Sequence, residues 1–303
     1  MKKDKVLFLL GATGCGKTSL SVRLAKDFDG EIISADSVQV FRDFNIGSAK
    51  VTAEEMQGVK HYGIDIKSPD EQFSASEYVD YTKACIREIV AKGKLPIIAG
   101  GTGLYVKALA CGYNFGGTAA NNQFRAEMEK MLEQEGIEMA VSILKAKNPS
   151  LLEGLDLQNK VRVIRALEIA EFGSKKAAGE CEFDFKLLAV TRPREELYQR
   201  INKRVDIMVE DGLFEEVEAL IEKYGDSCQP MTAIGYKEVK AYFAGEMTKE
   251  QCIEKIKQNT RHYAKRQLTF LRGMDEVEYA DLSEEGSYEK LKENISKWLK
   301  EKN

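Results

Sequence analysis

A glycine-rich segment at residues 11–18 is the feature that most constrains how this chain can fold, and it directly follows an apolar run at residues 6–10. Its sequence, GATGCGKT, satisfies G-x-x-x-x-G-K-[ST], the phosphate-binding loop (P-loop) that joins a buried strand to a helix. The glycines let successive backbone N–H groups point at a phosphate, Lys17 supplies a positive charge, and Thr18 can bind magnesium. We therefore predict a diphosphate site made of Gly11, Ala12, Thr13, Gly14, Cys15, Gly16, Lys17 and Thr18.

Strand-like and helix-like segments alternate along the first third of the chain. The strand-like runs lie at residues 6–10, 31–35 and 95–99. Helices are expected from about Lys17, from a Ser-x-x-Glu capping box at Ser74, and at residues 104–109 after a second glycine-rich turn, residues 100–103. Because the apolar runs are unbroken, the strands are expected to be buried on both faces, as in a parallel sheet. We predict an α/β fold: a P-loop NTPase-like parallel sheet flanked by helices, with a helical insertion domain.

The middle of the chain predicts that insertion. Residues 112–122 are rich in Gly and Asn, which is typical of a mobile loop, and residues 123–172 are almost wholly helical in pattern. The chain is expected to return to the sheet at residues 187–191 and to be helical thereafter. We therefore predict a core domain of residues 1–111 and 187–303, and a mainly helical insertion of residues 112–186.

The charge distribution argues against binding nucleic acid by bulk attraction, since the net charge is −4. Basic residues nevertheless cluster. Residues 255–272 hold six Lys or Arg and no acid, and smaller clusters lie at residues 160–165 and 192–204. One such stripe alone is more often a solvated helix face, but several together can grip a phosphate backbone at a defined place.

The cysteine, histidine and hydropathy patterns argue against a paired-cysteine metal site, histidine acid–base chemistry and a membrane-spanning segment. The six cysteines have no C-x-x-C spacing, and no apolar run is long enough to span a bilayer. No secretory signal pattern opens the chain, so we expect a cytoplasmic protein with reduced thiols and no membrane association. With only two histidines, His61 and His262, acid–base chemistry is expected from a carboxylate.

The loop predicts a bound diphosphate but leaves the reaction open. A nucleoside or nucleotide kinase, an NTP-driven switch or motor, and an enzyme that uses another diphosphate all fit it. Residues 31–36 also fit a Walker-B strand with Asp36 as a magnesium ligand, so the residues alone do not separate a catalytic base from a metal ligand at this position.

Five further segments resemble those of the bacterial tRNA dimethylallyltransferases, the IPP transferase family. They are ISADSVQV (33–40), PIIAGGTGLY (96–105), RVIRALE (162–168), AIGYKE (233–238) and AKRQLTFLR (264–272). They occur in the family's order and cover nearly the whole chain. Two departures are modest: Val38 stands where the family usually has Met, and Lys60-His61-Tyr62 stands where it usually has Pro-His-His.

The resemblance implies a reaction. A dimethylallyl group would pass from dimethylallyl diphosphate to the exocyclic amine of the adenine 3′-adjacent to the anticodon in tRNA, with magnesium as cofactor. The catalytic residues it implies are Asp36, Lys17, Thr18 and Arg204. Asp36 would take the proton of the amine and, with Thr18, hold magnesium; these two roles of Asp36 are compatible. Arg194 and Arg200 are the alternatives to Arg204 as the arginine on the leaving group.

The resemblance also implies which residues hold the anticodon stem-loop, from which the target adenine would be extruded. The implied tRNA contacts are Asp36, Ser37, Val38, Gln39, Thr102, Arg125, Arg162, Arg165, Gly235, Lys237, Lys265, Arg266 and Arg272. Among these, Arg162 and Arg165 would grip backbone phosphates from the insertion of residues 112–186, which the resemblance implies is a tRNA-binding domain. The protein is expected to act as a monomer.

Three rivals stay open at this point. A P-loop kinase would bind ATP and has no need for three basic helical patches. An adenylate isopentenyltransferase shares the loop but modifies a free nucleotide. An RNA-binding module without enzyme activity leaves the loop and Asp36 without a purpose.

Overall fold

The computed structural model describes residues 3–110, 113–114, 121–173, 177–178 and 182–301. The chain divides into two compact units, a larger one of Met1–Ala110 with Cys181–Asn303 and a smaller one of Cys111–Glu180. Most of the predicted Gly/Asn-rich loop lies outside the described residues.

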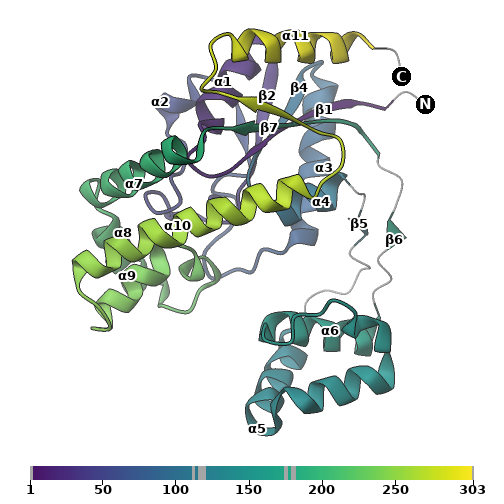
Figure 1. Cartoon of the computed structure of the whole chain (residues 1–303), viewed down its shortest axis with the longest axis vertical. Coiled ribbons are helices and arrows are strands. Elements are labelled where there is room, and N and C mark those ends of the chain that lie inside the picture. Colours follow the sequence, from purple (N-terminus) through teal and green to yellow (C-terminus); the bar gives the residue numbers. More distant parts are fainter. Residues whose placement is uncertain (1–2, 111–112, 115–120, 174–176, 179–181, 302–303) are drawn as a thin grey trace. The chain divides into compact units, whose positions relative to one another are not determined.

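The described part of the larger unit contains a six-stranded sheet whose order is β3-β2-β4-β1-β7-β8 (Figure 1). Its strands are β1 (Lys5–Gly11), β2 (Gly30–Ala35), β3 (His61–Tyr62), β4 (Leu95–Gly100), β7 (Asp184–Thr191) and β8 (Val277–Asp281). Every pairing is parallel, which confirms the predicted sheet. β7 begins at Asp184, three residues before the predicted return to the sheet.

β8 corrects the expectation that the chain is helical after residue 191. It is an edge strand beside β7, and its side chains are half-buried or exposed. Because an edge strand need not be apolar on both faces, residues 277–281 lack the unbroken hydrophobic run that marked the central strands.

Helices cover the sheet and extend beyond its carboxyl edge. They are α1 (Lys17–Asp27), α2 (Ala53–Met56), α3 (Ala75–Ala91), α4 (Gly103–Ala110), α7 (Arg194–Glu210), α8 (Leu213–Tyr224), α9 (Tyr236–Phe243), α10 (Lys249–Arg272) and α11 (Ser287–Lys300), with a 3-10 turn η2 (Gln229–Thr232). The predicted capping box opens α3: Glu77 N donates to Ser74 Oγ at 3.2 Å, and Ser74 N donates to Glu77 Oε2 at 2.9 Å. Among the described residues, no helix combines the length and the apolar character that crossing a membrane requires.

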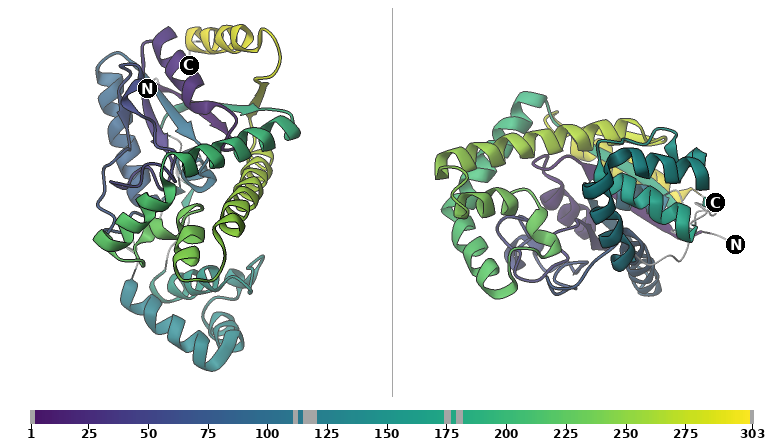
Figure 2. Two further views of the ribbon diagram at one scale, coloured as in Figure 1. Left: turned by 90° about the vertical axis from the view of Figure 1, so that its left-hand side faces the viewer. Right: turned by 90° about the horizontal axis from the view of Figure 1, so that it is seen from below.

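Two long helices, α7 and α10, pack against each other beyond the carboxyl ends of β1 and β7 (Figures 1 and 2). Lys257 Nζ lies 2.7 Å from Asp206 Oδ1, and Arg261 Nη1 donates to Asn202 Oδ1 at 2.6 Å. Part of the predicted basic stripe therefore faces α7 instead of solvent.

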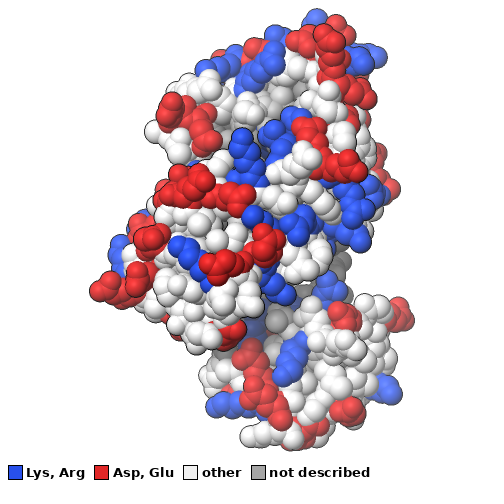
Figure 3. Space-filling model, turned by 60° about the vertical axis from the view of Figure 1, so that its left-hand side comes forward, with Lys and Arg blue, Asp and Glu red and all other residues white. Residues whose placement is uncertain are grey.

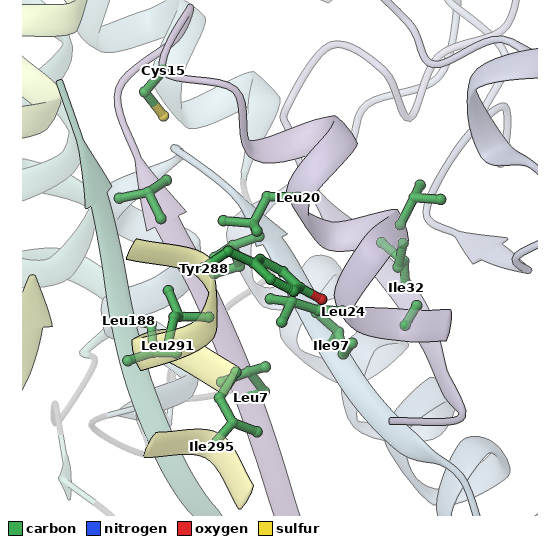
Figure 4. Packing of buried hydrophobic residues seen from close by; sticks show 14 of the residues in the cluster. Leu7, Cys15, Leu20, Leu24, Ile32, Ile97, Leu188, Tyr288, Leu291 and Ile295 are labelled. Atoms are coloured by element: carbon green, nitrogen blue, oxygen red, sulfur yellow. The ribbon is translucent and has the colours of Figure 1, made fainter. Parts of the chain in front are cut away.

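One hydrophobic cluster holds β1 and α1, the two elements that the P-loop joins. Figure 4 shows Leu291 and Ile295 of α11 beside Leu188 and Leu7. Each fully buried side chain of this size contributes about 1.5–3 kcal/mol. Tyr288 Oη also donates to Asp27 Oδ2 at 2.7 Å, which ties α11 to the end of α1. The strand and the helix on either side of the loop are thus firmly packed.

The described part of the smaller unit is mainly helical, as the fold prediction expects. It contains α5 (Asn122–Lys147), a 3-10 turn η1 (Pro149–Leu152) and α6 (Lys160–Phe172), with the short antiparallel pair β5 (Tyr113–Asn114) and β6 (Ala177–Ala178). Its own core includes Leu144, Val163 and Leu167. α5 is kinked at Gly136, whose φ of 78° is outside the helical region.

Gly100→Ala is expected to lower the free energy of unfolding by about 1–3 kcal/mol, because a Cβ at Gly100 would overlap the carbonyl oxygen of Ala35 and lie 2.6 Å from its Cβ. Gly273→Ala is the matched control, since its Cβ would meet only Phe270 O at 3.5 Å and Thr269 O at 3.9 Å. Thermal unfolding followed by circular dichroism measures both. Equal melting temperatures for the two variants would contradict the tight β2–β4 contact.

Candidate active site

The P-loop curls tightly between β1 and α1. Its glycines Gly11, Gly14 and Gly16 have φ values of 150°, 81° and 100°, which side chains with a Cβ rarely adopt. Lys17 opens α1, and its Nζ donates to the carbonyl oxygens of Gly11 at 2.9 Å and Ala12 at 2.8 Å. The lysine ammonium, the loop amides and the positive end of α1 are therefore concentrated at one place, which suits a diphosphate.

Two arginines hold the outer side of the loop. Arg192, just before α7, donates from Nε to the carbonyl oxygen of Cys15 at 3.0 Å, and Arg200 of α7 donates from Nε to that of Gly14 at 2.9 Å. Arg200, an alternative for the leaving-group arginine, thus supports the loop backbone. Arg194, the other alternative, lies over the ring of Tyr198 at 5.1 Å. Arg192 belongs to the basic cluster at residues 192–204, but nothing in the sequence distinguished it from the other basic residues of that cluster.

Asp36 follows directly after β2, at the carboxyl edge of the sheet. Its Oδ1 accepts hydrogen bonds from the amides of Val38 at 2.8 Å and Gln39 at 3.3 Å, which orient the carboxylate. β4 lies between β2 and β1, so the turn that carries Thr102 lies between Asp36 and the P-loop. In parallel α/β sheets this edge is where ligands bind.

The electrostatics around Asp36 mark a partly enclosed carboxylate. Burial lowers the pKa of the Arg204 guanidinium, and the Asp36 charge opposes that change. Burial raises the pKa of the phenols of Tyr105 and Tyr263, and the same Asp36 charge adds to the increase in both. Asp36 is therefore within electrostatic reach of side chains on α4, α7 and α10. Arg204 also interacts electrostatically with Cys15 of the loop, and its Nη2 donates to the carbonyl oxygen of Ala49 at 3.5 Å.

Residues 36–39 form a half-buried turn at the same edge. The side chain of Gln39 is held firmly, because its Oε1 accepts from Ser34 Oγ at 3.1 Å and its Nε2 donates to the carbonyl oxygens of Ser48 and Ala49. Ser37 and Val38 are half-buried beside it. The structure thus brings the predicted base and its three predicted neighbours into one rigid turn.

One further side chain joins the two glycine-rich turns. Gln267 of α10 accepts a hydrogen bond from the amide of Thr13 at 2.9 Å and donates from Nε2 to the carbonyl oxygen of Gly101 at 3.0 Å. Tyr263, one helical turn earlier, lies beside Gln267 and Thr102. Gln267 lies within a segment that resembles the family, yet its role is visible only in the folded chain.

The predicted basic contacts on the larger unit differ in exposure. Lys265, Arg266 and Arg272 of α10 and Lys237 of α9 are exposed, whereas Gly235 is buried at the start of α9. Figure 3 shows that Lys and Arg side chains on one face of the molecule are interspersed with Asp and Glu. On this face the basic residues form local patches and not one continuous field, in keeping with the negative net charge.

The smaller unit uses two of its predicted contacts in an ion pair. Glu168 is buried, and its carboxylate accepts from Arg125 Nη2 at 2.9 Å, from Arg165 Nη1 and from the amide of Asn121 at 2.9 Å. Arg125 and Arg165 are thereby held at the surface of α5 and α6 with part of their charge compensated. Arg162 is exposed on α6.

Acid should destabilise the smaller unit through Glu168. Burial alone would raise the pKa of this carboxyl, but hydrogen bonds from Arg125, Arg165 and Asn121 lower it to about 2. Because the folded pKa lies below the unfolded value of about 4.3, the ion pairs stabilise the fold above that pH, and the stabilisation is lost as the pH falls from 4.3 toward 2.

We therefore expect Glu168→Gln to lower the melting temperature at pH 7 and to weaken its dependence on pH below 4.5. Glu129→Gln, which changes an exposed carboxylate of α5, is the matched control. Melting curves at several pH values measure both variants. Identical acid dependence in Glu168→Gln and the unmodified chain would disprove the role of this ion pair.

Comparison with known proteins places the chain in one family. The family model described as IPP transferase matches residues 39–274. The tRNA dimethylallyltransferase of Bacillus cytotoxicus is 43% identical over 290 residues, which are 93% of this chain and 92% of that protein. That of Bacillus anthracis is 44% identical over 291 residues, covering 94% and 93%.

Solved structures of other proteins are also similar to this chain over nearly its whole length. The crystal structure of the tRNA isopentenylpyrophosphate transferase from Bacillus halodurans has a TM-score of 0.75 and 40% identity, covering 97% of this chain and 96% of that one. A eukaryotic dimethylallyltransferase, described as acting on tRNA, has a TM-score of 0.81 and 26% identity, covering 99% and 81%. The chain therefore belongs to the IPP transferase family.

Proposed function

We propose that this chain transfers the dimethylallyl group of dimethylallyl diphosphate to the exocyclic amine of the adenine 3′-adjacent to the anticodon in tRNA, releasing diphosphate. The observation that carries the proposal is the position of the Asp36 carboxylate at the same sheet edge as the P-loop. A base and a diphosphate cradle on one edge are what the displacement requires. The names of relatives that are 43% identical over most of the chain support the substrate.

The nucleophile needs a base. The lone pair of the adenine amine is delocalised into the purine ring, so a proton must leave the nitrogen as the new carbon–nitrogen bond forms. A carboxylate within hydrogen-bond reach of the amine accepts that proton. Asp36 is suited to this because the amides of Val38 and Gln39 hold Oδ1 in place.

The leaving group needs positive charge. As the carbon–oxygen bond breaks, negative charge collects on the diphosphate, where fixed N–H groups and cations stabilise it most effectively in a partly enclosed site. The loop amides and Lys17 supply this charge from one side, and Arg204 supplies it from α7. Arg204 is suited to the role because burial has already removed part of its hydration.

Magnesium fits the same edge. The Thr18 hydroxyl and the Asp36 carboxylate offer the hard oxygen ligands that Mg²⁺ prefers, and diphosphate oxygens would complete its shell. When bound, the ion would neutralise part of the diphosphate charge. The proton transfer and the contacts of Lys17 and Arg204 are assigned to the protein itself.

The tRNA substrate requires an extruded adenine and a held backbone. Bases in a single-stranded loop unstack at little cost, and the target would enter the pocket beside residues 36–39 and Thr102. The exposed Lys265, Arg266 and Arg272 would contact phosphates from the larger unit, and Arg162 from the smaller. We propose that a single chain suffices for this reaction.

Asp36→Asn is expected to reduce dimethylallyl transfer by about 100-fold or more, since the amide keeps the shape of the side chain but accepts no proton. The measurement is label transfer from radiolabelled dimethylallyl diphosphate to unmodified tRNA with magnesium present, alongside tRNA binding, which should persist. Asp80→Asn, in an exposed position of α3, is the matched control. Transfer by Asp36→Asn at the unmodified rate would remove Asp36 as the base.

Arg162→Ala should weaken tRNA binding and reduce the slope of log Kd against log salt by about one unit, as expected for the loss of one phosphate contact. Lys130→Ala, which removes an exposed charge of α5, is the control for a general charge effect. Binding is measured at several salt concentrations. An unchanged slope in Arg162→Ala, or the same change in both variants, would argue against a specific phosphate contact.

A further inference from the structure

We propose that Gln267 is a positioning residue that sets the spacing between the diphosphate cradle and the turn facing the adenine. The inference rests on the proposed function, because that function assigns the P-loop and the Thr102 turn to two different substrates. Gln267 touches neither substrate in this arrangement. It acts through the backbones of the two turns.

Gln267 bridges the two turns through two hydrogen bonds of its side-chain amide, and we call this bridge the Gln267 clamp. Gln267 is buried, with 8% of the residue exposed, and its side-chain amide lies between two backbone groups that are remote in the sequence. Its oxygen accepts from the amide of Thr13 at 2.9 Å, and its nitrogen donates to the carbonyl oxygen of Gly101 at 3.0 Å. The primary amide offers both an acceptor and a donor in this shape at any pH, whereas an ionised carboxylate lacks the donor and methionine offers at most a weak acceptor.

α10 packs closely against the Thr102 turn, so the two turns and the helix have no free space between them at these glycines. A Cβ at Gly101 would overlap Nε2 of Gln267 and lie 3.1 Å from its Cδ. A Cβ at Gly103 would lie 2.5 Å from Cδ1 of Phe270, one turn further along α10. The glycines on either side of Thr102 therefore let α10 rest directly on this turn. Their role here is small size, because neither has a positive φ.

The clamp controls the distance on which the reaction depends. Thr13 belongs to the cradle for the leaving diphosphate. Thr102 lies beside Tyr263, whose phenol pKa is raised by burial and further by the charge of Asp36. Bond formation requires the amine and the allylic carbon to be about 3–3.5 Å apart and aligned, and a 1 Å error can cost about 100-fold in rate. Separating the two turns would move the diphosphate away from the amine and its base.

Gln267→Met is expected to lower kcat for transfer about 10- to 100-fold, because the side chain keeps its size but loses its amide hydrogen bonds. It should also weaken the binding of inorganic pyrophosphate, since the amide of Thr13 is no longer held. Gln258→Met, an exposed position on the same helix, is the matched control and should behave as the unmodified chain. Melting temperatures identify any general loss of stability.

Gln267→Glu provides the readout that a merely structural role would not move. The carboxylate repels the carbonyl oxygen of Gly101, but once protonated it can donate to that oxygen and still accept from Thr13. Burial beside a carbonyl raises a carboxyl pKa, so the rate of this variant relative to the unmodified chain should rise as the pH falls from 8 to 5. The relative rate of Gln267→Met should stay flat.

These experiments distinguish a failure of the Gln267 clamp from a failure of the proposed function. If the unmodified chain labels tRNA, kcat of Gln267→Met within twofold of it, or a flat relative rate for Gln267→Glu, overturns the clamp. If the unmodified chain labels no tRNA, the proposed function fails, and pyrophosphate titration by calorimetry decides the clamp. Equal pyrophosphate affinity in Gln267→Met and the unmodified chain would then overturn it.

Discussion

The parallel pairing of β4 with both β1 and β2 is the constraint on which the candidate site depends. Because the three strands run in one direction, their carboxyl ends meet at one edge, and each end continues into a functional segment. β1 leads into the P-loop, β4 into the turn of Thr102, and β2 into Asp36. Packing by α1 and α11 fixes the strands, so the three segments keep their places.

α10 connects this edge with the exterior of the larger unit. Its inner face carries Tyr263 and Gln267 against the two turns, while Lys265 and Arg266 are exposed on the same helix. In the proposed function, α10 would therefore connect the contacts to the tRNA backbone with the geometry of the reaction. The arginines of α7 act in a similar way, since Arg200 holds the loop while Arg204 lies near Asp36.

Local patterns predicted the central sheet well, because strands buried on both faces leave unbroken apolar runs and the P-loop has a distinctive spacing. The position of Asp36 followed from its place at the end of a strand. The edge strand β8 was missed because its exposed residues carry no such run. The clamp by Gln267 and the ion pair of Glu168 with Arg125 join residues 254 and 43 positions apart, and no local pattern reveals contacts of this kind.

In the proposed function, the P-loop holds a prenyl diphosphate as a leaving group while Asp36 activates an adenine of tRNA. Incubation with radiolabelled dimethylallyl diphosphate, magnesium, and either unmodified tRNA or AMP tests it most directly, with ATP turnover followed in parallel. The proposal predicts label in tRNA and no consumption of ATP. Label confined to AMP, or ATP turnover with no label in either acceptor, would contradict it.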